Sequence, residues 1–284
     1  MMNKLRLGIV GYGFVGQATE YAFMTPNVET FIVDPKYNDN TLEDLVEWKP
    51  KVVFICLPTP SLDDGSINSS LVETAVNYIK DKSHNTFIII KSTVTPDIVD
   101  QLTSQEFNVV YVPEFLSEGN AKMDMVTASH MVIGSHYAEA ATFVEDIYEK
   151  YSMCDPAPTI RVNPVEASFV KYTINTFLAM KTAYFNQIYS LANDYGISYQ
   201  NVLKGALADP RIGYSHTKVP GPDGKMGFGG ACFPKDLDAF IHFADKQTDT
   251  KLHILKSVRT TNNRIRSEYE ADDREKANNI KFKQ

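Results

Sequence analysis

The sequence predicts an α/β fold: a Rossmann-like, doubly wound parallel sheet, followed by a long connecting helix and a small all-helical domain. Two observations predict the sheet. Short apolar runs alternate with helix-type segments, and most runs are continuous in Val, Ile and Phe, as in strands buried on both faces. A third observation predicts a second domain, because only helix-type spacing follows residue 163. We therefore expect a sheet domain over residues 1–163 and a helical domain over residues 164–284.

The first domain is expected to contain seven strands and at least three helices. The strands are expected at Leu5–Val10, Thr30–Val33, Val52–Leu57, Phe87–Ile90, Val109–Val112, Met131–Ile133 and Thr159–Val162. The helices are expected at Val15–Phe23, Ser70–Lys80 and Ala138–Tyr151.

The second domain is expected to begin with one long helix. Asn163 is a good N-cap, Pro164 suits the first helical position, and Glu166 completes the start signal. Apolar residues then recur at helical spacing as far as Gly196, which gives about eight or nine turns. Further helices are expected at Tyr199–Leu207, at Pro234–Asp245 and from Leu252 onward, and the charged stretch Arg264–Gln284 is expected as a fraying helix or loose tail.

Composition limits the possible partners and the compartment. The 284 residues carry a formal net charge of −7 without a Lys/Arg-rich run, which disfavours nucleic acid and anionic membranes as partners. No segment is apolar over a membrane-spanning length, and the N-terminus lacks a signal-peptide pattern. Three cysteines do not make a disulfide framework, and Cys56 lies in an apolar run typical of a buried thiol. A cytoplasmic location is therefore expected.

A glycine-rich motif follows the first expected strand and opens the first expected helix. In this G-x-G-x-x-G, Gly11 permits a tight turn, Gly13 lets a pyrophosphate approach the backbone, and Gly16 allows close helix–strand packing. Asp34 ends the next strand, where a carboxylate accepts from ribose hydroxyls and repels a 2′-phosphate. The motif predicts dinucleotide binding with NAD favoured over NADP, although nearby Lys36 weakens that preference. A glycine turn without a ligand is the less favoured alternative.

A second glycine-rich segment surrounds Cys232. Pro234 suits the start of a helix, so Cys232 is expected just ahead of a helix N-terminus, where the dipole and nearby Lys235 favour the thiolate. Asp236 follows one turn later, where it can hold or activate a water. The glycines around the cysteine leave room for a bulky substrate: Gly227, Gly229 and Gly230. A structural cysteine after a glycine loop is the alternative.

Seven stretches, in order over about residues 5 to 262, resemble the UDP-glucose/GDP-mannose dehydrogenase family. They are Gly11–Gly16, Cys56–Pro60, Lys91–Val94, Pro113–Gly119, the helix with Glu166, Lys171 and Asn175, Asp209–Gly213 and Gly227–Asp236. The resemblance implies an NAD-binding domain over residues 1–163 and a substrate and dimerisation domain over residues 164–284. The apolar stripe of the long helix is larger than a single small domain should be able to bury. The resemblance implies that this helix forms the core of a homodimer.

The resemblance assigns roles to residues that the sequence already marks. Lys171 and Asn175 share a helix face, among apolar neighbours that indicate partial burial, and would stabilise an oxyanion at C6 of the sugar. Glu114 and Glu118 follow a strand end, where ligands of α/β sheets bind. Glu114 would act in thioester hydrolysis, Glu118 would lie near the nicotinamide, and Thr93 would hold the attacking water.

The remaining assignments also come from the resemblance. The cofactor-binding set is Gly11, Gly13, Phe14, Val15, Gly16, Asp34, Lys36, Thr59, Thr93, Glu118 and Lys235. The substrate-binding set is Glu114, Phe115, Leu116, Lys171, Asn175, Arg211 and Gly229, and the catalytic set is Cys232, Lys171, Asn175, Asp236, Glu114 and Thr93. NAD is the single cofactor expected, and no metal site is expected.

The implied reaction is the four-electron oxidation of UDP-glucose to UDP-glucuronate. The C6 alcohol becomes an aldehyde, Cys232 captures it as a thiohemiacetal, a second hydride transfer gives a thioester, and water releases the acid. Two NAD are reduced per sugar. GDP-mannose or a UDP-amino-sugar remains open as the substrate, although Pro113–Gly119 and Phe233 favour UDP-glucose.

Two further alternatives differ in activity. A single-oxidation β-hydroxyacid dehydrogenase would need no nucleophilic cysteine, so Cys232 disfavours it. A non-catalytic NAD-binding accessory chain is disfavoured because the expected catalytic residues are all present. Family members usually carry a third, Rossmann-like domain that helps to hold UDP, and no further Val/Ile strand runs follow the helix with Asn262. We therefore expect weaker substrate binding unless a partner replaces that part.

Overall fold

The computed structural model describes residues 4–282, except for the side chain of Glu118. The chain divides into two compact units. The first comprises residues 1–59 and 68–171, and the second comprises residues 60–67 and 172–284. This division falls inside the long helix, eight residues after the expected boundary. The reason is local: the first turns of that helix belong to the sheet unit, where Ser168 Oγ donates to the carbonyl of Val94 over 2.9 Å.

The first unit is built on one seven-stranded sheet, which confirms the predicted fold class. The strands are β1 (Leu5–Val10), β2 (Val28–Val33), β3 (Val52–Ile55), β4 (Phe87–Ile90), β5 (Val109–Tyr111), β6 (Met131–Gly134) and β7 (Thr159–Val162). Their order is β2-β1-β3-β4-β5-β6-β7. All seven expected runs form strands, with ends that shift by at most two residues.

One pairing departs from the expected parallel sheet. β5 and β6 are antiparallel and share the single pair Tyr111–Gly134, whereas every other neighbouring pair is parallel. Between β5 and β6 the chain forms a short 3₁₀ turn (Glu118–Asn120) and α5 (Ala121–Val126). A chain that turns back from the end of a strand, rather than crossing over the sheet, enters its neighbour in the opposite direction. Apolar patterning alone does not encode strand direction.

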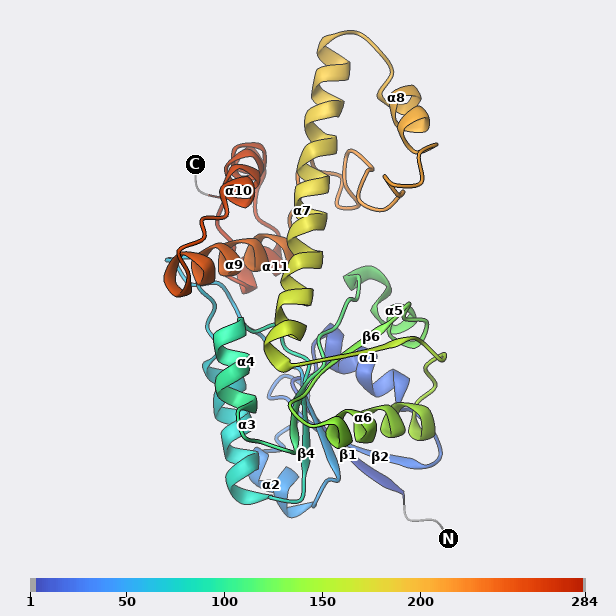
Figure 1. Ribbon diagram of the computed structural model, residues 1–284, viewed down its shortest axis with the longest axis vertical. Helices are drawn as coiled ribbons and strands as arrows, with labels where there is room; N and C mark the ends of the chain where they lie inside the picture. Colours follow the sequence, from blue (N-terminus) through green and yellow to red (C-terminus); the bar gives the residue numbers. More distant parts are fainter. Residues whose placement is uncertain (1–3, 283–284) are drawn as a thin grey trace. The chain divides into compact units, whose positions relative to one another are not determined.

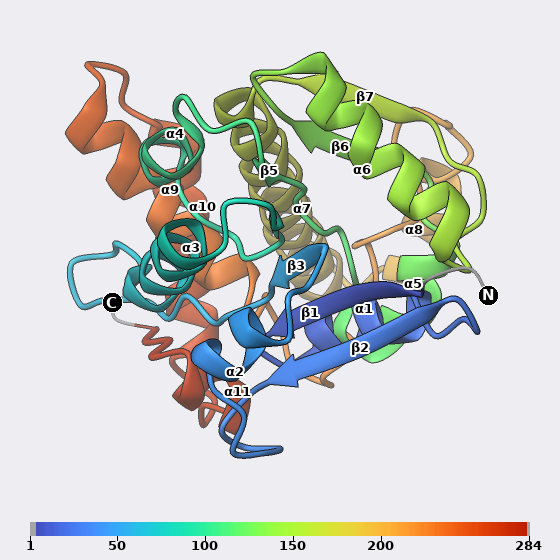
Figure 2. The ribbon, with the colours of Figure 1, turned by 90° about the horizontal axis from the view of Figure 1, so that it is seen from below.

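Helices cover both faces of the sheet (Figure 1; Figure 2). One face carries α1 (Phe14–Ala22), α5 and α6 (Ala138–Tyr151), and the other carries α2 (Leu42–Glu47), α3 (Ser70–Lys82) and α4 (Pro96–Thr103). The sequence did not predict α2, α4 or α5, which are eight residues or shorter. Two of these helices have a helix-start signal in the sequence. Thr41 and Asp44 form a capping box at the start of α2, and Pro96 lies in the first turn of α4.

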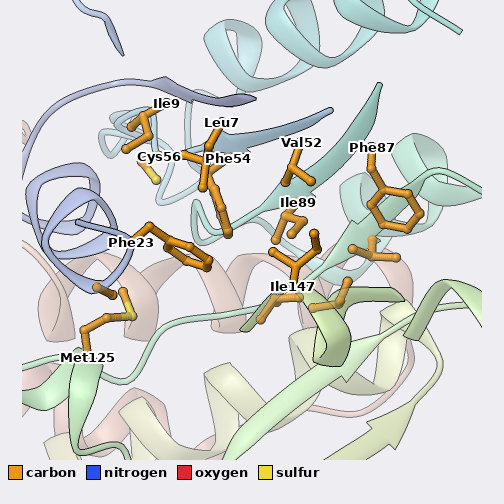
Figure 3. Close-up of a cluster of buried hydrophobic side chains, with 14 of the residues drawn as sticks. Leu7, Ile9, Phe23, Val52, Phe54, Cys56, Phe87, Ile89, Met125 and Ile147 are labelled. Carbon is orange, nitrogen blue, oxygen red and sulfur yellow. The ribbon is translucent and has the colours of Figure 1, made fainter. Parts of the chain in front are cut away.

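The core under α1, α5 and α6 explains the continuous apolar runs. In Figure 3, Leu7, Val52 and Phe54 of the strands lie near Phe23 at the end of α1 and Ile147 of α6. Alternate residues of the same strands face the opposite helices, so the strands are buried on both faces. Cys56 belongs to this core, as expected, and burial raises the pKa of its thiol to about 12.

The second unit is helical. It contains most of α7 (Pro164–Asp194), together with α8 (Tyr199–Ala206), α9 (Phe233–Gln247), α10 (His253–Arg266) and α11 (Asp273–Ala277). The predicted start of α7 is confirmed: the Asn163 side chain accepts from the Glu166 N–H over 2.8 Å, and the Glu166 side chain accepts from the Asn163 N–H over 2.9 Å. Within residues 4–282, none of the helices is long and apolar enough to cross a membrane.

The prediction of a fraying helix or loose tail over Arg264–Gln284 is wrong for the residues up to 282, which the structure describes. α10 continues to Arg266, and α11 follows with a capping box between Asp272 and Glu275. The chain then contacts the segment 60–67, where Ser61 N–H donates to the carbonyl of Asn278 over 3.0 Å and Lys281 pairs with Asp63 over 2.6 Å. A polar segment can be ordered by buried ion pairs and caps, which its low hydropathy does not reveal.

Candidate active site

The glycine-rich motif forms the tight turn between β1 and α1. Gly11 has a φ of +90°, and a Cβ there would lie 2.6 Å from the carbonyl oxygen of Cys56. A Cβ on Gly16 would lie 2.2 Å from the carbonyl oxygen of Gly11, so this glycine permits the helix to pack on the turn. A Cβ on Gly13 would meet nothing within 4 Å. The backbone of Gly13 is therefore open to a ligand at the N-terminus of α1, where Phe14 and Val15 begin the helix.

Asp34 lies directly after β2, and two backbone N–H groups orient its carboxylate. Tyr12 N–H donates to Oδ2 over 2.7 Å, and Lys36 N–H donates to Oδ1 over 2.9 Å. The side chain of Lys36 is exposed. The carboxylate thus stands beside the glycine turn, which is the position that recognition of a ribose requires. These residues fit a dinucleotide.

The loops after β3 and β4 are joined by side-chain hydrogen bonds. The buried hydroxyl of Thr59 donates to the carbonyl of Thr93 over 2.9 Å, and Ser92 Oγ donates to the carbonyl of Leu57 over 2.8 Å. Thr93 itself is half-buried. The two threonines predicted to contact cofactor and water therefore lie together at the carboxyl edge of the sheet.

Glu114 and Lys171 form a buried ion pair within the first unit. Lys171 Nζ lies 2.9 Å from Glu114 Oε1 and donates to the Glu114 carbonyl over 2.5 Å, and the two residues are 2% and 6% exposed. Leu116 N–H donates to Glu114 Oε2 over 2.7 Å, and the Phe115 ring lies 5.5 Å from the ammonium nitrogen. The ammonium is held by a carboxylate, a carbonyl and an aromatic ring, so its position is narrowly defined.

A second buried polar group lies in the helical unit. Asp236 Oδ2 accepts from the Asn175 amide over 2.6 Å, and Asp236 Oδ1 lies 2.6 Å from Lys235 Nζ. All three side chains are buried. Lys235 therefore pairs with Asp236, an interaction that the sequence prediction, which placed its charge near the thiol, did not foresee.

Cys232 is the N-cap residue of α9, and its carbonyl accepts from the Asp236 N–H over 2.8 Å. Its side chain is half-buried. The helix begins at Phe233, so Pro234 occupies the second helical position and not the first. A thiol at the N-terminus of a fifteen-residue helix lies in the positive field of the helix dipole, which favours the thiolate.

Two glycines near Cys232 have a packing role that the sequence did not reveal. A Cβ on Gly227 would lie 2.6 Å from Asn262 Oδ1, and a Cβ on Gly229 would lie 1.5 Å from Arg266 Nη2. Only Gly230, with a φ of +76°, has open space beside it. The space beside the Cα atoms of Gly227 and Gly229 is thus filled by side chains of α10 and, at Gly229, also of α11.

One predicted residue, Arg211, belongs to neither buried polar group, and a second, Glu118, cannot be compared with them. The side chain of Arg211 is 87% exposed and pairs with Asp209. Glu118 is described only by its backbone, so its predicted role near the nicotinamide lies outside the described side chains.

The sequence analysis assigned no role to Lys91, which is buried directly after the Ile run of β4. Its Nζ donates to the carbonyl of Val112 over 3.2 Å, and burial lowers its pKa. Lys91 lines a cavity of about 690 Å³ together with Glu114, Phe115 and Leu116. The sequence does contain an indication of this burial, because Lys91 directly follows an apolar run typical of a buried strand.

Comparison with known proteins gives matches to two domains of one family. Residues 47–152 match the NAD binding domain of the UDP-glucose/GDP-mannose dehydrogenase family, and residues 165–264 match its central domain.

Individual relatives agree with these matches. The UDP-glucose 6-dehydrogenase of Rickettsia bellii is 36% identical over 219 residues, which cover 75% of this chain and 49% of that protein. The UDP-glucose 6-dehydrogenase TuaD of Bacillus subtilis is 31% identical over 225 residues, which cover 76% and 47%. The structure of a UDP-glucose dehydrogenase from Pyrobaculum islandicum superposes with a TM-score of 0.78 at 27% identity, covering 92% of this chain and 68% of that one. The chain spans about half the length of the curated relatives it matches.

Proposed function

Because the chain belongs to the UDP-glucose/GDP-mannose dehydrogenase family, we propose that it oxidises UDP-glucose to UDP-glucuronate with NAD, through a thioester on Cys232. The observation that carries this proposal is the place of Cys232 at the N-terminus of α9, with the buried Asn175, Asp236 and Lys235 group in the same unit. A single-oxidation dehydrogenase has no use for an activated thiol there.

The glycine turn, Asp34, Thr59 and Thr93 are proposed to hold NAD. Support comes from the open backbone at Gly13, the N-terminus of α1 and the oriented carboxylate of Asp34. NAD bound by these residues would supply the acceptor for hydride from the C6 carbon of the sugar. Phe14, Val15, Lys36, Glu118 and Lys235 complete the proposed cofactor set.

Lys171 and Asn175 are proposed to stabilise negative charge on the C6 oxygen. An ammonium held by Glu114 has little freedom to move away from a developing oxyanion, which is how preorganised groups lower a barrier. The Asn175 amide is fixed in the same way by Asp236. Phe115, Leu116, Arg211 and Gly229 remain proposed substrate contacts.

Cys232 is proposed to attack the aldehyde carbon. The C–S bond forms, and the carbonyl oxygen takes a proton to give a thiohemiacetal. Transfer of a second hydride from that carbon to a second NAD, with loss of the hydroxyl proton, re-forms the C=O bond and leaves a thioester. Water then adds to the thioester carbonyl and the C–S bond breaks, which releases the carboxylate and the thiolate, with Asp236, Glu114 and Thr93 proposed to orient the water.

Three finer parts of the function are also proposals. UDP-glucose is preferred over GDP-mannose or a UDP-amino-sugar because relatives more than 30% identical are named UDP-glucose 6-dehydrogenases. A homodimer through α7 is supported by its exposed apolar residues Phe177, Tyr184 and Leu191. A cytoplasmic location suits an enzyme whose nucleophile is a cysteine thiol, because a reducing compartment keeps thiols reduced.

The test is NADH formation from UDP-glucose and NAD, with the Cys232→Ser variant alongside. We expect two NADH per UDP-glucose in the parent and no complete double oxidation in the variant. Demonstrable NAD binding without NADH formation at high UDP-glucose would contradict the proposal for this sugar and favour another sugar nucleotide or a non-catalytic role.

A further inference from the structure

A buried ion pair between Arg266 and Glu275 packs against the glycine-rich segment that precedes Cys232. Arg266, the last residue of α10, and Glu275 of α11 are each 1% exposed, and Arg266 Nη2 lies 3.0 Å from Glu275 Oε1. Arg266 Nη2 also lies 2.6 Å from Asp223 Oδ2, and its Nη1 donates to the carbonyl of Met226 over 3.3 Å. The guanidinium thus joins α11 to the chain just before the glycines.

Side chains accept hydrogen bonds from the backbone N–H groups of three of the four residues in the segment 227–230. Gly227 N–H donates to Asn186 Oδ1 over 2.8 Å, and Phe228 N–H donates to Asn262 Oδ1 over 2.8 Å. Gly230 N–H donates to Glu275 Oε1 over 3.1 Å, which is the same oxygen that faces Arg266. A loop with three glycines has much conformational freedom to lose, so such anchors decide which conformation it adopts.

The glycine at 229 shows how closely the pair and the segment fit. A Cβ there would lie 1.5 Å from Arg266 Nη2 and 2.2 Å from Glu275 Oε1. Any larger residue would displace the guanidinium. Arg266 and Glu275 therefore require a glycine at position 229, three residues before Cys232, the N-cap of α9.

Glu275 is fixed from its own side as well. Its second oxygen accepts from the Asp272 N–H over 2.8 Å and closes the capping box of α11. The carboxylate therefore has one oxygen for its own helix and one for Arg266 and Gly230. Because its own helix holds the Glu275 side chain in place, this side chain can restrain the position of the neighbouring segment 227–230.

On the premise that Cys232 is the nucleophile of the proposed reaction, we propose that Arg266 and Glu275 are positioning residues. Their ion pair fixes the segment 227–230, and through it the backbone that presents Cys232 at the N-terminus of α9. Neither residue touches the thiol in this role. The segment after α10 is then part of the catalytic apparatus and not a solvated end.

The decisive variant replaces the pair by apolar residues, Arg266→Met with Glu275→Leu. Such replacements of buried ion pairs often preserve stability, but these side chains cannot accept the Gly230 N–H. We expect a folded protein whose NAD affinity and KM for NAD change less than twofold. We expect backbone hydrogen exchange of residues 227–232 to become at least tenfold faster and kcat to fall at least tenfold.

Two single variants complete the test. Glu275→Gln keeps the side-chain volume but removes the charge and one acceptor oxygen, so we expect a smaller change of about threefold in both exchange and kcat. Lys276→Ala alters an exposed neighbour on the same helix and should leave both unchanged. If the double variant destabilises the fold, hydrogen exchange and kcat of Glu275→Gln, compared with those of the parent, test the positioning role.

The outcomes separate this inference from the proposed function. Folded Arg266 and Glu275 variants with parental exchange and parental kcat would overturn the positioning role. If the parent oxidises no sugar nucleotide, the proposed function fails, whereas hydrogen exchange and peptide-resolved alkylation of Cys232 still report on the loop. Parental exchange and alkylation rates in the variants would then overturn the positioning role on their own.

Discussion

At the scale of single residues, the most informative feature is that the charged groups proposed for chemistry are paired and buried. Lys171 faces Glu114, and Lys235 faces Asp236. Removing one member of a buried pair leaves a charge without a partner, which costs about 3–5 kcal/mol, whereas removing both costs far less. The pairs therefore make stability and activity separable by experiment.

We expect Lys171→Met to lower the free energy of unfolding by about 3–5 kcal/mol, because it leaves the buried Glu114 carboxylate without its ion-pair partner. The double variant Lys171→Met/Glu114→Gln should recover most of that loss while remaining inactive. Urea unfolding and NADH assays of the parent, both single variants and the double variant measure the two effects. Full additivity of the single-variant losses would show that the ion pair does not couple the two residues.

The three cysteines should differ strongly in reactivity. Burial raises the pKa of Cys56 from 9.0 to about 12 and also raises that of Cys154. Because the folded-state pKa of Cys56 exceeds its unfolded value, folding favours the protonated thiol. This preference is intact below about pH 9 and is lost as the pH rises towards 12. At pH 8 we expect iodoacetamide to modify Cys232 at least 100-fold faster than Cys56, as peptide-resolved mass spectrometry would measure. Equal modification rates for Cys232 and Cys56 would mean that Cys56, which directly follows β3, is accessible to solvent.

At the scale of elements, the glycines of the turn between β1 and α1 have different structural roles, although they belong to one sequence motif. Gly16 lies against the carbonyl of Gly11, whereas Gly13 has open space beside it. The first serves packing, and the second leaves room for a ligand. The same distinction separates Gly229 from Gly230 before α9.

This difference predicts opposite results for two alanine substitutions. Gly16→Ala should destabilise the protein, because its Cβ would lie 2.2 Å from a backbone oxygen. Gly13→Ala should leave the melting temperature nearly unchanged but weaken NAD binding at least tenfold, because its methyl group would occupy the space of the pyrophosphate. Thermal unfolding and calorimetric NAD titration of the matched pair test this. Unimpaired NAD binding by Gly13→Ala would remove the turn from the cofactor site.

At the scale of the whole molecule, α7 leaves large apolar side chains in solvent. Phe177, Tyr184 and Leu191 recur every seven residues on one face and are 54%, 55% and 63% exposed. A self-complementary stripe of this kind suits a two-fold contact with a second copy. The proposed homodimer would bury it.

We expect the parent to be a dimer and Tyr184→Glu/Leu191→Glu to be a folded monomer, because a charge on each residue would oppose burial of the stripe. Light scattering after size-exclusion chromatography measures the mass. Asn193→Glu, which is exposed elsewhere on the same helix, is the control and should remain dimeric. A parent that is monomeric at micromolar concentration would contradict the proposal.

Much of the fold could be predicted because its signals are local. β1, β4 and β7 match the expected bounds, and the α7 cap lies where Asn163 and Glu166 indicate. The short helices α2, α4 and α5 escaped prediction because few residues carry their periodicity. The α11 segment escaped because its order comes from an ion pair with Arg266, which apolar periodicity does not register, and from contacts with residues 60–67, which are far away in the sequence.

The sequence by itself determined the alternation of strands and helices, the glycine turn before α1 and the place of Cys232 ahead of α9. Each depends on residues a few positions apart, whose preferences act before any long-range contact forms. Only the tertiary structure decided which charges meet. Lys171 reaches Glu114 across 57 positions, and Asn175 reaches Asp236 across 61. The direction of β6 and the hydrogen bond from Gly230 N–H to Glu275 belong with these pairs, because packing brings such groups together and spacing along the chain does not record it.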